Sequence, residues 1–226
     1  MNNQSRLSDV CSAEQTLTMF SEICDFMCND EKTEEDFDRI VADIIERKAW
    51  QDILFFSLCG YGWCSKAFIK CMNLIPKDER WRLLLTVYSR DGYDFPKEII
   101  LDSMSYRPCD YLSCIPQEYD TETIKVYRAS TTPYKNRGRL LDELSWTVSP
   151  KVARDFYQMR LSRGEKCYIY SAEIKKKDII ACMSFGIDGQ KEILQYHSIH
   201  NLSFLSQREL DIACSIEELG ERLRRK

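Results

Sequence analysis

The chain has 226 residues, of which 44% are hydrophobic, so it is long enough for one large core or two small ones. Its 32 basic and 36 acidic residues give a net charge of −4, which argues against a protein that binds nucleic acid through overall basicity. The start, MNNQSRLSDV, lacks the profile of a secretory signal, and no apolar run approaches a membrane span. We therefore expect a cytoplasmic protein without membrane contact.

The cysteines and histidines do not predict a metal site. The 11 cysteines include no C-x-x-C pair, and their spacings do not favour a zinc site. The two histidines, His197 and His200, are three residues apart, a spacing that puts side chains on opposite faces of a strand. We expect reduced thiols and no bound metal.

Residues 1–105 are predicted to form an all-helical domain. Phe37, Ile40, Val41, Ile44 and Ile45 recur at helical spacing after Thr33, which can cap the start of a helix. The pattern continues over 50–59, 63–74, 79–89 and 96–105, with Gly- and Pro-containing breaks between these segments. The aromatic side chains in these segments are interpreted as core.

Residues 106–120 are predicted to be a connection between two domains. This segment is rich in turn-forming residues and contains Pro108 and Pro116. Residues 121–226 then form a second domain.

The second domain has strand patterning, with the hydrophobic period changing from 3.6 to 2. Strands are predicted at 124–129, 144–148, 167–174, 178–184, 190–196 and 200–205. Residues 131–142 are predicted to be a loop, and Lys175–Lys177 a solvated turn. Ser149 and Pro150 open a helix whose predicted buried stripe is Val152, Ala153, Phe156 and Tyr157. A closing helix over 207–226 carries Leu210, Ile212, Ile216, Leu219 and Leu223. The fold class is thus α+β, with a mainly antiparallel sheet.

Three of the strands carry polar residues that suit a binding cleft. VYRAS carries Arg128, LSWTV carries Ser145 and Thr147, and QKEIL carries Gln190 and Glu192. Alternation puts Ser145 and Thr147 on one face, and Gln190 and Glu192 on one face. An arginine, hydroxyls and a carboxylate around one cleft suit a substrate that has phosphates and a ribose.

These motifs resemble the Arg–Ser–Glu class of ADP-ribosyltransferases, over roughly residues 118–206. In that family an Arg strand, an S-x-[ST] strand and a [EQ]-x-E strand follow in this order. SWT followed by Ser149-Pro150 and VARDFY resembles short bacterial and phage members. The resemblance implies an ADP-ribosyltransferase-like split sheet in 121–226, NAD as substrate, and a bacterial or phage effector or toxin.

The resemblance also implies roles for individual residues. Glu192 would stabilise the oxocarbenium-like transition state in which the nicotinamide–ribose bond breaks, and Ser145 would support Glu192 or the ribose. Arg128 would hold the pyrophosphate or ribose, with Thr147 beside Ser145. Further expected NAD contacts are Phe156 or Tyr157, stacking on the nicotinamide, and Tyr134, Asn136 and Arg137 in the segment that covers the dinucleotide.

Each residue also has a structural interpretation. Arg128 could pair with an acidic neighbour, Ser145 and Thr147 could be ordinary strand residues, and Phe156 could belong to the core. Glu192 could face solvent.

The chain departs from the family at Gln190, which replaces the first acidic residue of the E-x-E pair. We expect a mono-ADP-ribosyltransferase that modifies a macromolecule, protein or nucleic acid, at a group other than arginine. The alternatives are an NAD glycohydrolase and a non-catalytic interaction protein. The helical domain would recognise the target, cover the cleft or bind a partner protein.

Overall fold

A computed structural model describes residues 18, 21–26, 33–60, 62–91, 95–113, 115, 119, 121–183 and 191–224. The chain divides into two compact units, Met1–Pro108 and Cys109–Lys226. The division falls within the segment 106–120 that the sequence predicts to be a connection.

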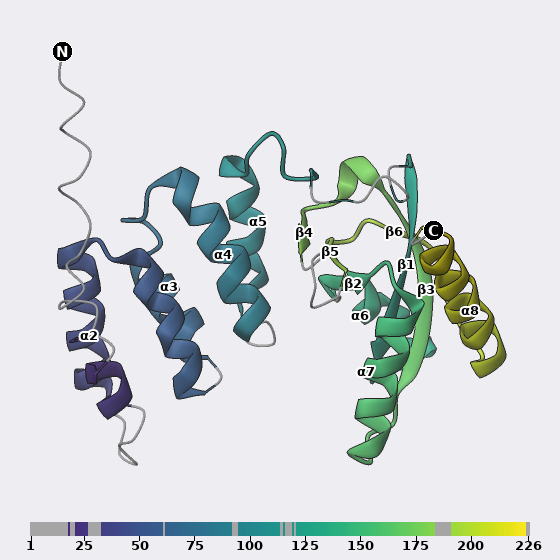
Figure 1. The fold of residues 1–226 in the computed structure, drawn as a ribbon, viewed down its shortest axis with the longest axis horizontal. Helices are drawn as coiled ribbons and strands as arrows, with labels where there is room; N and C mark the ends of the chain where they lie inside the picture. The colour runs from purple at the N-terminus through teal and green to yellow at the C-terminus, as the bar shows by residue number, and fades with distance from the viewer. Residues whose placement is uncertain are drawn as a thin grey trace. The chain divides into compact units, whose positions relative to one another are not determined.

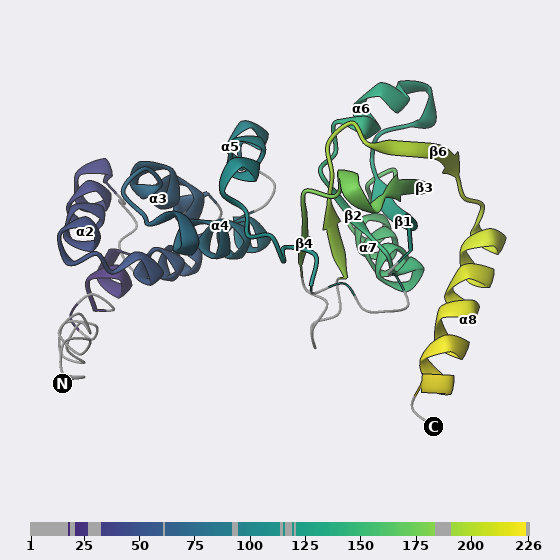
Figure 2. The same cartoon turned by 90° about the horizontal axis from the view of Figure 1, so that it is seen from above.

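The described part of the first unit consists of helices and the turns between them. Its elements are α2 (Glu34–Arg47), the 3-10 helix η1 (Trp50–Cys59), α3 (Trp63–Cys71), α4 (Lys77–Asp91), α5 (Lys97–Ser103) and the 3-10 helix η2 (Met104–Tyr106). Figures 1 and 2 show α2, α3 and α4 side by side in chain order. No strand occurs among the described residues between 33 and 108, as the helical spacing predicts.

Helix α2 starts where its cap is predicted. The Thr33 side chain accepts a hydrogen bond from the Asp36 backbone N–H at 3.1 Å, which satisfies one of the free donors of the first turn. Of the predicted apolar positions, Phe37, Ile40, Val41 and Ile44 are buried and Ile45 is half-buried.

The segment 50–59 is a 3-10 helix and not the α-helix that the sequence analysis expects. Its buried residues, Trp50, Ile53, Phe56 and Cys59, recur at every third position. A 3-10 helix has three residues per turn, so this spacing places all four on one face, whereas an α-helix would rotate them away from one another.

The described part of the second unit forms a six-stranded antiparallel sheet with helices and is α+β. The strands are β1 (Thr123–Ser130), β2 (Ser145–Thr147), β3 (Tyr168–Lys175), β4 (Ala181–Met183), β5 (Glu192–Leu194) and β6 (Ile199–Phe204), in the order β4-β5-β2-β1-β3-β6. The core includes the fully buried side chains of Val126, Tyr170 and Ile193. β4 starts later than predicted because the 3-10 helix η5 (Lys176–Asp178) occupies the preceding residues.

The segment 131–142 is not the loop that the sequence analysis expects. It forms the 3-10 helix η4 (Tyr134–Asn136) and the short helix α6 (Arg137–Leu141). Leu140 of α6 is completely buried in the core beside the sheet. Packing of this side chain therefore stabilises a helical turn that local propensity does not predict.

The described residues of the second unit also form the helices α7 (Pro150–Ser162) and α8 (Gln207–Arg224). Ser149 caps α7 by accepting a hydrogen bond from the Val152 N–H at 3.2 Å, as predicted. α7 packs against β1, β2 and β3, and α8 packs against α7 (Figure 1). None of the described helices is long and apolar enough to cross a membrane.

The predicted apolar stripes of α7 and α8 are partly wrong. On α7, Ala153 is buried, but Phe156 is 37% exposed. On α8, Leu210 is buried, whereas Ile212, Ile216, Leu219 and Leu223 are exposed. The helix period does show which residues share a face, but it does not show which face the protein buries.

Candidate active site

The three motif strands are direct neighbours in the sheet. In the order β5-β2-β1, the strand with Glu192 lies next to the strand with Ser145, which lies next to the strand with Arg128. Thr147 is opposite Glu192 in the β2–β5 register, so both side chains start on the same face, and alternation adds Ser145. Residues far apart in the sequence thus come together at the middle of the sheet.

Ser145 and Glu192 form a hydrogen bond between their side chains. The Ser145 hydroxyl donates to Glu192 Oε1. Burial raises the pKa of the Glu192 carboxyl, while the Ser145 hydrogen bond and the positive charge of Arg128 lower it, and the net pKa is raised. Glu192 is therefore not a solvent-facing surface carboxylate but one largely withdrawn from water.

Arg128 pairs with an acidic neighbour, Glu143. Its Nε donates to Glu143 Oε2 and its Nη1 donates to the Ser145 carbonyl oxygen. Tyr127, and not Arg128, is opposite Thr147, so Arg128 leaves β1 on the face opposite to the Ser145 and Thr147 side chains. Its guanidinium nevertheless reaches the backbone of Ser145, and its charge acts on Glu192.

Glu143 is a site residue that the sequence analysis missed. Its carboxylate accepts hydrogen bonds from Ser130 at 2.7 Å and from Thr132 at 3.2 Å, in addition to Arg128. Its carbonyl oxygen accepts from Trp146 Nε1 at 3.0 Å and from Gln195 Nε2 at 2.8 Å, which fixes the backbone there. The one signal in the sequence is its position two residues before Ser145, in the segment that leads into β2.

The Thr147 hydroxyl is engaged by the backbone around it. It donates to the Lys191 carbonyl oxygen at 3.2 Å and accepts from the Ser149 N–H at 3.1 Å. The residue is buried. These contacts join the end of β2 to the start of β5, which is a structural use of a residue expected to contact NAD.

The two predicted aromatic contacts differ in their surroundings. Tyr134 is 42% exposed and its ring stacks on that of Tyr170, with ring centres 6.3 Å apart. Because Tyr170 is opposite Arg128 in the β1–β3 register, Tyr134 lies on the Arg128 side of the sheet. Phe156 is exposed on α7, while Tyr157 packs against Ile169 and Leu210. Asn136 and Arg137 are exposed, and Gln190 lies outside the described residues.

A buried carboxylate of α8 holds the start of β5. Glu217, with 7% of its side chain exposed, accepts hydrogen bonds from Lys191 Nζ at 2.8 Å and from the Ser149 hydroxyl at 2.8 Å. Burial lowers the pKa of Lys191, but the hydrogen bond and charge of Glu217 outweigh it and the net pKa is raised. Lys191 has a positive φ of 46° and directly precedes Glu192, so this network fixes the backbone at the catalytic candidate.

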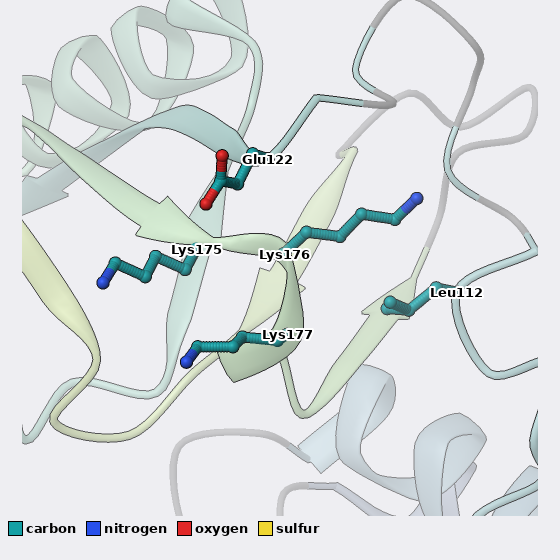
Figure 3. A pocket seen from close by; sticks show the side chains of 5 residues that line it. All are labelled: Leu112, Glu122, Lys175, Lys176 and Lys177. Atoms are coloured by element: carbon teal, nitrogen blue, oxygen red, sulfur yellow. The ribbon is translucent and has the colours of Figure 1, made fainter.

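A pocket of about 470 Å³ lies at the other end of β1. It is lined by Leu112, Glu122 and Lys175–Lys177, so the predicted lysine turn is one wall of a pocket. Glu122 precedes the first residue of β1 and Arg128 is the sixth, which separates the pocket from Arg128 by roughly 20 Å of strand. Figure 3 shows Lys176 pointing toward Leu112, while Lys175 and Lys177 point the other way. The three ammonium groups do not converge on one ligand position.

The described residues contain no group of three or more His, Cys, Asp or Glu side chains arranged to hold a metal ion. Comparisons with known proteins find no matching family model, no similar curated protein and no similar solved structure. The functional proposal therefore rests on the side chains described above.

Proposed function

We propose that this protein is an NAD-dependent mono-ADP-ribosyltransferase of the Arg–Ser–Glu class, with an ADP-ribosyltransferase-like sheet in its second unit. The observation that carries the proposal is the Ser145–Glu192 hydrogen bond, formed between neighbouring strands by two residues 47 positions apart. A carboxylate that is half-buried in this way is costly for stability alone, and such groups are concentrated at functional sites.

Glu192 supplies the electrostatic part of the reaction. As the nicotinamide–ribose bond breaks, positive charge develops on the ribose, and an ionised carboxylate beside it stabilises that charge. Partial burial strengthens this effect, because less water screens the charge than at the surface. Ser145 fixes the orientation of the carboxylate and helps to keep it ionised against the effect of burial.

Arg128 supplies the cationic part of the NAD site. Two of its nitrogens are engaged by Glu143 and Ser145, which orient the guanidinium plane. Because Glu143 balances the charge of Arg128, the pair is close to neutral, and Arg128 acts on NAD as a fixed hydrogen-bond donor more than as a free charge. Tyr134 is exposed on the Arg128 side of the sheet, whereas the Ser145 and Glu192 side chains leave the sheet on the other side. We therefore propose that NAD contacts Arg128 where its guanidinium reaches the Ser145 backbone.

The direct test of catalysis is Glu192→Gln. Loss of one transition-state contact of about 3 kcal/mol lowers the rate of nicotinamide release by about a hundredfold or more. NAD affinity changes little, because the contact strengthens mainly in the transition state.

The acceptor is not an arginine side chain. This prediction rests on Gln190, the residue two before Glu192, which in the family faces the incoming acceptor. A guanidinium is always charged and favours a carboxylate there, whereas a neutral amide suits an amide, a hydroxyl or a nucleobase edge. Mass spectrometry of the modified product identifies the acceptor atom; an adduct on arginine contradicts the prediction.

The experiment for the whole proposal is incubation of the protein with NAD labelled on the adenylate part and a cell extract. Transfer of label to protein or nucleic acid, lost in Glu192→Gln, is the expected result. Nicotinamide release with no labelled macromolecule would instead identify an NAD glycohydrolase. Absence of NAD binding would reject both enzymatic functions and leave an interaction protein.

A further inference from the structure

Helix α8 has two faces of different character. On one face Leu210 and Cys214 are buried against Ile169 of β3, and Glu217 binds Lys191. On the other face four aliphatic side chains, called here the α8 stripe, are between 52% and 67% exposed: Ile212, Ile216, Leu219 and Leu223. Figure 2 shows α8 continuing from the end of β6. Single exposed aliphatic residues are common, but four aligned on one helix face indicate an interaction surface.

The spacing of the α8 stripe is that of a helix that packs on another helix. Its members are separated by four, three and four residues. This is the alternation of core positions in a coiled-coil seam, which forms when two helices cross at a shallow angle. The surface therefore fits a helix better than a strand or a flat surface.

The stripe is symmetric along the helix. Ile212 and Leu223 lie equally far from the midpoint between Glu217 and Glu218, and so do Ile216 and Leu219. If a second α8 runs antiparallel to the first, Ile212 of one copy therefore meets Leu223 of the other. Ile216 meets Leu219 in the same way, and the arrangement closes about a twofold axis.

The charges beside the stripe favour the same arrangement. One flank carries Asp211, Ser215, Glu218 and Arg222, each directly before a stripe residue. In the antiparallel pair Asp211 of one copy lies about 3 Å along the axis from Arg222 of the other, so the twofold axis generates two acid–base pairs. Glu218 lies beside Glu218 of the other copy near the axis, and this one like-charge contact opposes the two attractive pairs. In a parallel pair this flank of one copy faces the other flank of its partner, so Asp211 and Arg222 form no such pairs.

We propose that the α8 stripe binds the α8 stripe of a second copy of this chain, antiparallel about a twofold axis. The inference uses only the packing and charges of α8 and is independent of the enzymatic function proposed above.

Sedimentation velocity of the full chain over a micromolar concentration range tests the proposal. The wild type shows a reversible monomer–dimer equilibrium, and the double variant Ile216→Glu/Leu219→Glu raises its Kd by about a hundredfold or more, because both central contacts are lost. The matched control is Leu58→Glu, an aliphatic residue of η1 that is 53% exposed, and it leaves the Kd unchanged. Circular dichroism of each variant checks that it is folded.

A charge swap tests the antiparallel orientation. Asp211→Arg and Arg222→Asp each place like charges together and weaken the dimer by about tenfold. The two substitutions in one chain regenerate the acid–base pairs and restore the wild-type Kd. A wild-type chain that stays monomeric overturns the proposal. In that case the α8 stripe is covered by another part of the same chain or by lipid, and not by a second copy. A dimer that tolerates the glutamates, or a swap that fails to restore pairing, overturns it as well.

Discussion

At the scale of single residues, opposed electrostatic effects of the site set the pKa of Glu192. Burial disfavours the ionised carboxylate, while the Ser145 hydroxyl and the Arg128 charge favour it. Because the net pKa is raised, Glu192 protonates at a higher pH than an exposed glutamate. The proposed chemistry needs the ionised form, so activity falls as the pH drops through this raised pKa.

Ser145→Ala shifts this acidic limb to higher pH. The substitution removes the hydrogen bond that lowers the pKa of Glu192, and burial continues to raise it. The expected result is that nicotinamide release at neutral pH falls more than at alkaline pH, where Glu192 is ionised again. The pH–rate profile of both proteins measures the shift, and an unchanged acidic limb would show that the Ser145–Glu192 contact does not control the titration.

Arg128 has a structural role and a proposed ligand role, and a second substitution separates them. Arg128→Ala leaves the carboxylate of Glu143 partly buried without its ion-pair partner, at a cost on the order of 2 kcal/mol in the free energy of unfolding. It also weakens NAD binding strongly.

Adding Glu143→Gln to Arg128→Ala restores much of the stability, because the uncompensated charge is gone and an amide oxygen still accepts from Ser130. NAD affinity stays low. Thermal unfolding and NAD-binding calorimetry on the single and double variants check both expectations. Recovery of NAD affinity in the double variant would mean that Arg128 only neutralises Glu143.

At the scale of elements, α8 controls the strand that carries Glu192. Glu217→Gln removes the charge that holds Lys191, so the start of β5 is less firmly placed. Small misplacements of a catalytic group are costly, and we expect turnover to fall about tenfold while NAD affinity changes little.

Glu218→Gln is the control for Glu217→Gln, since it alters the next residue of the same helix and forms no ion pair among the described residues. Single-turnover kinetics and binding measurements separate the two effects. An equal loss in both variants would assign the effect to helix stability in general.

The elements themselves were predictable to different degrees. Strands β1 and β3 have long alternating patterns, and the Ser149 and Thr33 caps have strong local preferences, so local physics specified them. The adjacency of β1, β2 and β5 was not predicted, because strand order depends on long-range pairing that no local pattern contains.

The errors have a common physical origin in tertiary packing. Burial of Leu140 stabilises a short helix in a segment that has loop-forming residues. The exposure of Phe156 and of the α8 stripe depends on where the neighbouring elements lie. Glu143 joined the site through contacts with Arg128 and Ser130 on a different strand, which no local pattern contains.

At the scale of the whole molecule, the described residues of the candidate site all belong to the unit Cys109–Lys226. We propose that the helical unit Met1–Pro108 recognises the acceptor, covers the cleft or binds a partner protein. If the helical unit recognises the acceptor, substitutions on its surface change the rate of transfer to a macromolecule but not the rate of nicotinamide release.

The most direct test of Glu192 as the catalytic residue is the rate of nicotinamide release from NAD, measured for the wild type, Glu192→Gln and Glu173→Gln. Glu173 is a carboxylate of β3 that is bound to Asn201 and is not in contact with the site residues, so it serves as the control. We predict that the wild type and Glu173→Gln release nicotinamide at similar rates. Glu192→Gln is slower by about a hundredfold or more, with nearly unchanged NAD affinity. Release by Glu192→Gln at the wild-type rate would contradict the assignment of the site.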